Sequence, residues 1–177
     1  MSTPLRILVV STSLNSNSKS RSIASVAKDH LETLGAVVDW VDLQDHALPF
    51  CDGQDSNKDP VALEMRKKVE EADGILMTAP VYNYDLNAAS KNFIELTGRA
   101  WTGKIVALAV SAGGQRSGMS PLGMMNSLML DFRCIVLPRF VYASRGDYTE
   151  DGQLKETPLE RLHELTTELV RVSTALR

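Results

Sequence analysis

The feature that most constrains the fold is a regular alternation, along the whole chain, between short apolar runs and segments with helical periodicity. The apolar runs lie at residues 5–10, 36–43, 74–79, 104–110 and 134–141. Apolar residues at helical spacing follow each of these runs, as they do in βαβ units. The alternation therefore predicts an α/β fold in which a five-stranded parallel sheet carries helices on both faces.

The character of individual strands indicates their place in the sheet. Residues 36–43 alternate between two faces, which is typical of a half-exposed edge strand. Pro138 indicates that 134–141 lies at an edge, because proline cannot donate to a neighbouring strand. We therefore predict a doubly wound, flavodoxin-like sheet with strand order 2-1-3-4-5, in a single domain spanning 1–177, with a long surface loop over 44–60.

Charge and composition exclude several classes of function. The net charge is −3, so the chain has no excess of the basic residues by which nucleic-acid-binding proteins bind phosphates. No apolar run approaches the roughly 20 residues of a membrane span, and the start, MSTPLRILVV, has no signal-peptide pattern. We therefore expect a cytoplasmic protein without nucleic-acid or membrane partners, in which Cys51 and Cys134 are reduced thiols. His30, His46 and His163 are far apart in the sequence and have no ligand spacing, so we expect no metal site.

The loop at 11–22, between the first strand and its helix, consists almost entirely of hydroxyls, amides and cations: STSLNSNSKSRS. Oriented donors at the positive end of a helix dipole favour a phosphate. One alternative is a solvated loop in which Ser18 or Ser20 only caps the helix. Another is a nucleotide-triphosphate loop over 13–20, which is disfavoured because serine stands at both glycine positions and the later strands lack a terminal Asp for Mg²⁺.

Two further loops follow the third and fourth strands, and in a sheet of this order all three loops meet at one crevice. Tyr82, Asn83 and Tyr84 offer stacking and edge hydrogen bonds to a flat heteroaromatic ligand such as a flavin, or form a turn whose tyrosines pack on the protein's own surface. The glycines of SAGGQRSG, at 111–118, permit backbone approach to a ligand or positive φ, or form a flexible loop. Arg116 could pair with a nicotinamide-nucleotide phosphate or be solvated. Together the three loops indicate one binding site.

With these loops the chain resembles the NADPH-dependent FMN reductase family, in the branch with bacterial quinone and chromate reductases, from Leu5 to about Val141. The family's phosphate loop reads G-S-L-R-x-G-S-x-N, where this chain has TSLNSNSKS at 12–20. The family's second loop, P-E-Y-N-x-S-x-P-G followed by L-K-N-x-I-D, aligns with PVYNYDLNA at 80–88 and SKNFIE at 90–95. The third loop matches through Ser111, Gly114 and Gly118.

The resemblance implies an FMN-dependent NAD(P)H oxidoreductase. Hydride would pass from NADPH or NADH through bound FMN to a small acceptor such as free flavin or a quinone, with no catalytic side chain, in a homodimer or homotetramer. The FMN-binding residues that it implies are Ser13, Asn15, Ser18, Lys19 and Ser20 at the phosphate, Pro80, Val81, Tyr82, Asn83 and Tyr84 at the ring, and Ser111, Gly113 and Gly114 on the other side.

The chain departs from the family pattern at three positions, because Asn15 and Ser120 stand where the family has arginine and Val81 stands where it has glutamate. Lys19 or Arg21 would then supply the charge that Asn15 lacks. Two other functions stay open. One is a flavodoxin-like FMN electron carrier without NAD(P)H turnover, and the other is an interaction module without a cofactor.

Overall fold

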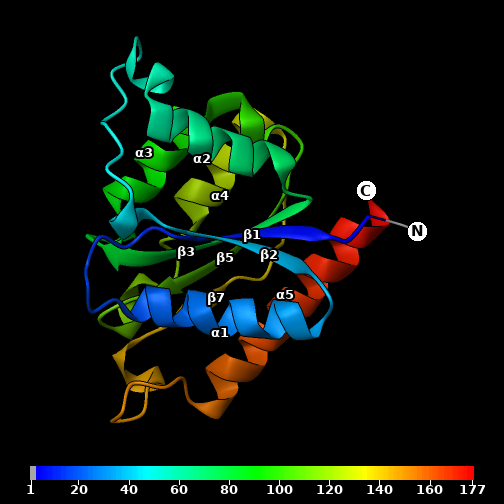
Figure 1. Cartoon of the computed structure of the whole chain (residues 1–177). Coiled ribbons are helices and arrows are strands. Elements are labelled where there is room, and N and C mark those ends of the chain that lie inside the picture. Colours follow the sequence, from blue (N-terminus) through cyan, green and yellow to red (C-terminus); the bar gives the residue numbers. More distant parts are fainter. Residues whose placement is uncertain (1–2) are drawn as a thin grey trace.

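The computed structural model describes residues 3–177 and has a parallel sheet at its centre, with helices on both faces (Figure 1). The strands are β1 (Arg6–Ser11), β2 (Val37–Asp42), β3 (Gly74–Tyr82), β4 (Asp85–Leu86), β5 (Ile105–Ser111), β6 (Ile135–Val136) and β7 (Val141–Ala143). The helices are α1 (Lys19–Thr33), α2 (Pro60–Glu71), α3 (Ala88–Thr97), α4 (Leu122–Phe132) and α5 (Glu156–Ala175).

The strand order confirms the predicted doubly wound sheet. The order is β2-β1-β3-β5-β6, and these pairs are parallel, whereas β4 forms a short antiparallel pair with β3. The predicted single strand over 134–141 is wrong in one respect, because it is divided into β6 and β7, which both pair with β5. Pro138 lies in the interruption and has no N–H to continue the ladder. This divided strand forms the edge opposite β2, as the proline indicates.

Each face of the sheet packs against its own helical layer. In β1, Leu8 and Val10 belong to the core beneath α2, α3 and α4, whereas Ile7 and Val9 belong to the core beneath α1 and α5. Figure 1 shows these two layers on opposite sides of the sheet. This is why the central strands are apolar on both faces.

The first helix shows how local sequence sets the ends of the elements. Ser18 caps α1, its hydroxyl accepting a hydrogen bond from the Arg21 backbone N–H at 3.2 Å. The helix stops before Gly35, whose φ of +83° is accessible to glycine at little cost. The predicted loop over 44–60 is confirmed as far as Asp59, with α2 beginning at Pro60, and two short 3₁₀ turns, Leu43–Asp45 and Ser56–Lys58, lie at its start and near its end. Within 3–177, none of the helices is long and apolar enough to cross a membrane.

Gly74, at the start of β3, is a close-packed position that we expect to tolerate no side chain. A Cβ there would overlap the Ser173 hydroxyl and lie 3.0 Å from Ile7 Cδ1. Gly74→Ala should therefore lower the free energy of unfolding by about 1–3 kcal/mol through overpacking, measured by denaturant titration. Gly123→Ala in α4 is the control, because its nearest neighbour would be Asp85 Oδ1 at 3.9 Å and its stability should not fall. Equal stability of the two variants would contradict the packing described.

Candidate functional site

The three predicted loops emerge together at the carboxyl edge of the sheet. Ser11 is in register with Thr78, and Pro80 is in register with Ser111, so the ends of β1, β3 and β5 are adjacent. The residues predicted at the crevice thus come from neighbouring strands. Each loop is held by contacts that the sequence pattern does not reveal.

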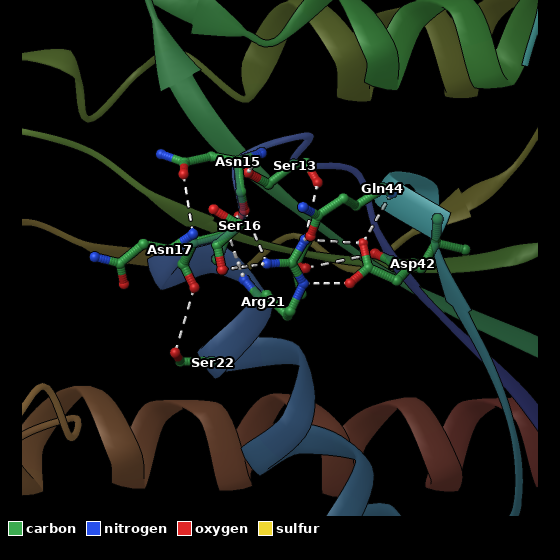
Figure 2. A network of polar contacts seen from close by, with 12 residues as sticks. Ser13, Asn15, Ser16, Asn17, Arg21, Ser22, Asp42 and Gln44 are labelled. Carbon is green, nitrogen blue, oxygen red and sulfur yellow. Dashed lines mark hydrogen bonds and ion pairs between the residues drawn. The ribbon is translucent and has the colours of Figure 1, made fainter. Parts of the chain in front are cut away.

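Arg21 organises the first loop from the first turn of α1 (Figure 2). Its guanidinium forms an ion pair with Asp42 at the end of β2, and it donates to Gln44 Oε1 at 2.5 Å. It also donates to three carbonyls of the loop, those of Asn15 at 2.8 Å, Ser16 at 3.1 Å and Ser13 at 3.3 Å. Arg21 is therefore occupied with the loop backbone and Asp42, so it is not a free cation for a phosphate.

Because Arg21 binds these loop carbonyls, it also fixes the direction of the backbone N–H groups in the same peptide bonds. The C=O and N–H groups of a trans peptide point in opposite directions, so the N–H groups of Leu14 and Ser16 face away from Arg21. Among residues 3–177, these two groups and the N–H groups of Lys19 and Ser20 have no hydrogen-bond acceptor. Free N–H groups at a helix N-terminus form an anion site.

The serine hydroxyls of this loop bond within the loop. Ser13 and Ser20 are buried, with Ser13 Oγ accepting from the Asn15 N–H at 3.3 Å and Ser20 Oγ lying 2.9 Å from Ser18 Oγ. Ser18 also caps α1, as one alternative expected. Asn15 and Lys19 are exposed. A phosphate at this loop would therefore meet the N–H groups of Leu14, Ser16 and Lys19 and the exposed side chains before it met the buried hydroxyls of Ser13 and Ser20.

The second loop is a hairpin. Strand β3 continues through Pro80 and Tyr82 and pairs with β4, so the predicted end of this strand at Ala79 is wrong. Asn83 and Tyr84 form the turn with φ of +52° and +69°, as two-residue hairpins require. An aromatic residue in this conformation is strained by about 1–2 kcal/mol, and such strain is concentrated at functional sites.

The two tyrosines of the hairpin are more than half exposed, Tyr82 at 53% and Tyr84 at 57%. They do not pack into the surface of the protein, as the purely structural alternative would require. Val81 is half-buried and Pro80 is buried. The hairpin therefore presents two aromatic side chains and the Asn83 amide to a ligand.

Asn87 connects the second loop to the first through a buried network that the sequence analysis missed. Its amide donates to the Thr12 carbonyl at 2.7 Å, and its Oδ1 accepts from the hydroxyls of Thr12 at 2.9 Å and Ser90 at 2.6 Å. Asn87 directly precedes α3, but its side chain forms no cap there. No local signal indicates a partner 75 residues away.

The third loop presents open backbone. Gly113 and Gly114 are exposed, neither has positive φ, and a Cβ at either position would have no atom within 4 Å. The structure agrees with the predicted access to the backbone at these glycines and not with the predicted positive φ. The Tyr142 hydroxyl donates to the Gly114 carbonyl, and the Tyr148 hydroxyl donates to Ser111 Oγ at 3.0 Å. Arg116 is exposed.

His30 and His163, which are far apart in the sequence, stack in the structure with ring centroids 4.0 Å apart. They lie between α1 and α5, and His30 Nδ1 is 2.7 Å from Thr166 Oγ1. Burial lowers the pKa of His30, and the neighbouring His163 lowers it further. Within residues 3–177, no group of three or more His, Cys, Asp or Glu side chains could hold a metal ion.

The donors of the carboxyl edge fit a ligand with an anionic tail and a flat ring. Free N–H groups of the first loop suit the tail, while the exposed tyrosines and open glycine backbone leave space for the ring. FMN has both parts. The chemistry of these donors and the access to them both suit FMN.

Comparisons with known proteins agree with this chemistry. A family model described as NADPH-dependent FMN reductase matches residues 5–148. A NADPH azoreductase from Bacillus sp. (strain OY1-2) is 26% identical over 167 residues, which cover 93% of this chain and 90% of that protein. A probable NADPH:quinone oxidoreductase 2 from Oryza sativa subsp. japonica is 30% identical over 160 residues, which cover 85% of this chain and 79% of that protein. The solved structure of FerB, a flavoenzyme NAD(P)H:(acceptor) oxidoreductase from Paracoccus denitrificans, has the same fold, with a TM-score of 0.79, 19% identity and coverage of 97% of this chain and 98% of that chain.

Proposed function

The chain belongs to the NADPH-dependent FMN reductase family, and from this premise we propose that it transfers reducing equivalents from NADPH or NADH through bound FMN to a small acceptor. The observation that carries the proposal is the meeting of free N–H groups, exposed aromatics and open glycine backbone at one edge of the sheet. We also propose that residues 1–177 belong to one FMN-binding domain.

Bound FMN would supply the hydride and electron chemistry, and the protein would supply binding, orientation and electrostatics. The first loop would hold the phosphate through the N–H groups of Leu14, Ser16, Lys19 and Ser20. The hairpin would cover one side of the ring, with Asn83 at its polar edge, and Gly113 and Gly114 would let the ring approach the backbone. No acid–base or nucleophilic side chain is required.

The acceptor is proposed to be a small redox-active molecule, such as free flavin, a quinone or an azo compound. The relatives named above act on acceptors of this kind.

A second copy of the chain would cover exposed apolar side chains near the crevice, so we propose a homodimer or homotetramer. These side chains are Leu14 in the first loop, Phe50, which lines the same pocket as Leu14, and Met119, which follows the third loop. Cys51 and Cys134 are free thiols, which suits the reducing cytoplasm.

A steady-state assay of the FMN-loaded protein tests this proposal. NADPH oxidation should depend on added flavin, quinone or azo acceptor, and denatured protein should show no such turnover. An FMN electron carrier would retain FMN through dialysis without oxidising NAD(P)H. An interaction module without a cofactor would retain no FMN.

A substitution at Asn83 tests the ring site without destabilising the folded protein. Asn83→Gly removes the amide while keeping a residue that adopts positive φ readily. We expect FMN to bind about tenfold more weakly, as the loss of one hydrogen bond implies, with an unchanged free energy of unfolding. Titration of flavin fluorescence and denaturant unfolding measure the two effects.

Asn83→Ala is the companion variant. It should lose the same affinity and in addition about 1 kcal/mol of stability, because alanine is strained at this φ. Unchanged FMN affinity in Asn83→Gly would contradict the placement of the ring edge at Asn83.

A further inference from the structure

Tyr148, in the segment between β7 and α5, contacts one residue of the third loop, Ser111, and one of the first loop, Lys19. The residue is 9% exposed and packs in the core beneath α1 and α5. Its hydroxyl donates to Ser111 Oγ at 3.0 Å, and Lys19 Nζ lies 5.0 Å from the centroid of its ring. One side chain thus links the end of β5 to the first turn of α1.

The hydrogen bond from Tyr148 leaves Ser111 with a free proton. A serine hydroxyl has one proton to donate, and the bond from Tyr148 uses one of its two lone pairs and leaves that proton unused. No other residue in the described range, 3–177, accepts the Ser111 proton, although Ser111 is only 9% exposed. Burial raises the pKa of Tyr148, so the phenol stays protonated and continues to donate. Ser111 is therefore available as a donor to a ligand in the crevice.

The ring of Tyr148 also fixes the position of a cation. Lys19 is exposed and forms no ion pair with a carboxylate in the part of the chain that the structure describes. Its ammonium lies over the aromatic face, where the ring quadrupole attracts it. Gly152 leaves the necessary space, because a Cβ at that position would be only 2.6 Å from Lys19 Nζ.

Lys19 and Arg21 are the two cations of the first loop, and the structure separates their roles. Arg21 is engaged by Asp42 and the loop carbonyls, whereas the Lys19 ammonium has no anionic partner. We propose that Tyr148 is a positioning residue for the phosphate end of FMN, its ring holding the Lys19 ammonium and its hydroxyl turning the Ser111 proton toward the phosphate. This inference rests on the proposed function and names the residues that replace the family's phosphate-loop arginine.

Fluorescence titration of the full chain with FMN, and with riboflavin, which lacks the phosphate, tests the inference. The two dissociation constants are compared for each variant. Lys19→Met should weaken FMN binding about tenfold, as loss of a charge-assisted contact implies, and leave riboflavin binding unchanged. Tyr148→Leu should produce the same FMN-specific loss, and the double variant should bind no more weakly than Tyr148→Leu alone. Lys28→Met is the matched control, because Lys28 lies further along α1 and pairs with Glu32 at 2.9 Å.

Two further variants test the ring and the hydroxyl of Tyr148 separately. They also keep the test valid if Tyr148→Leu fails to fold. Tyr148→Phe keeps the ring, so it should weaken FMN binding only about threefold, and adding Ser111→Ala should cause no further loss. Gly152→Asn introduces a residue that adopts positive φ more often than most, although it is strained at +86°, and its Cβ displaces the Lys19 ammonium. It should therefore repeat the Lys19→Met result while Tyr148 itself is kept.

The outcomes distinguish this inference from the proposed function. Equal losses for FMN and riboflavin, additive losses in the double variants, or normal FMN binding by Lys19→Met would overturn the role of Tyr148. If the wild-type protein itself binds no FMN, the proposed function fails. If the wild type binds FMN and every variant binds it equally well, only the positioning role fails.

Discussion

Replacing Arg21 with methionine is expected to lower the free energy of unfolding by about 3 kcal/mol, because it leaves a buried carboxylate without its partner. Asp42 is 5% exposed, and its remaining hydrogen bond is from the Gln44 N–H at 3.1 Å. The same change releases the carbonyls of Ser13, Asn15 and Ser16. FMN affinity should therefore fall by at least about a hundredfold, since several N–H donors lose their orientation together.

The double variant Arg21→Met/Asp42→Leu separates these two effects. Replacing both members of a buried ion pair by apolar residues is often neutral for stability, so the free energy of unfolding should return close to that of the wild type. FMN affinity should stay low, because the loop carbonyls still lack their donor. Recovery of affinity together with stability would show that Arg21 acts only by neutralising Asp42. Denaturant unfolding and flavin fluorescence give the two readouts.

Asn87→Asp should destabilise the protein by about 3 kcal/mol at neutral pH, because an ionised carboxylate cannot donate to the Thr12 carbonyl and is buried without a counter-charge. Protonation restores a donor at this position. The folded-state pKa of the new carboxyl should therefore lie above its unfolded value of about 3.9. Stability relative to the wild type should be highest below that unfolded pKa and be lost as the pH rises through the folded-state pKa.

Asn92→Asp provides the matched control for this pH dependence. The Asn92 amide donates to the Pro49 carbonyl at 2.9 Å and its Oδ1 accepts from the Cys51 N–H at 2.8 Å, but the residue is only half-buried. Its replacement should change stability much less, since water can solvate the carboxylate. A pH-independent loss in Asn87→Asp, or equal losses in both variants, would contradict the coupling of α3 to the first loop. Thermal unfolding between about pH 3 and pH 8 measures both variants, which covers the unfolded pKa.

The sequence was sufficient to predict the sheet, because its strongest signal is the alternation of strands and helices. It was insufficient where a single residue changes the backbone. Pro138 indicates an edge but does not show that the strand is divided, with β6 and β7 both pairing with β5. The tyrosine at position 84 gives no sign of positive φ, so the hairpin at Asn83 and Tyr84 could not be recognised.

The candidate site could be located but not resolved in detail. Parallel strands bring their carboxyl ends to one edge, so three polar or glycine-rich loops after adjacent strands are expected to converge. The residues that hold these loops are distant in sequence, as with Arg21 and Asp42 or Thr12 and Asn87. Their pairing depends on tertiary packing, which no local pattern encodes. For the same reason the sequence could not assign different roles to Lys19 and Arg21. In the structure Lys19 lies over the Tyr148 ring, whereas Arg21 pairs with Asp42.

The central claim, hydride transfer from a nicotinamide nucleotide to FMN held at this edge, is tested most directly by anaerobic mixing of the FMN-loaded protein with NADPH or NADH. The flavin absorption should bleach with either or both nucleotides, and subsequent addition of a quinone should restore it. Retention of FMN with no bleaching by either nucleotide would contradict the reductase function and favour an electron carrier that receives electrons from another source.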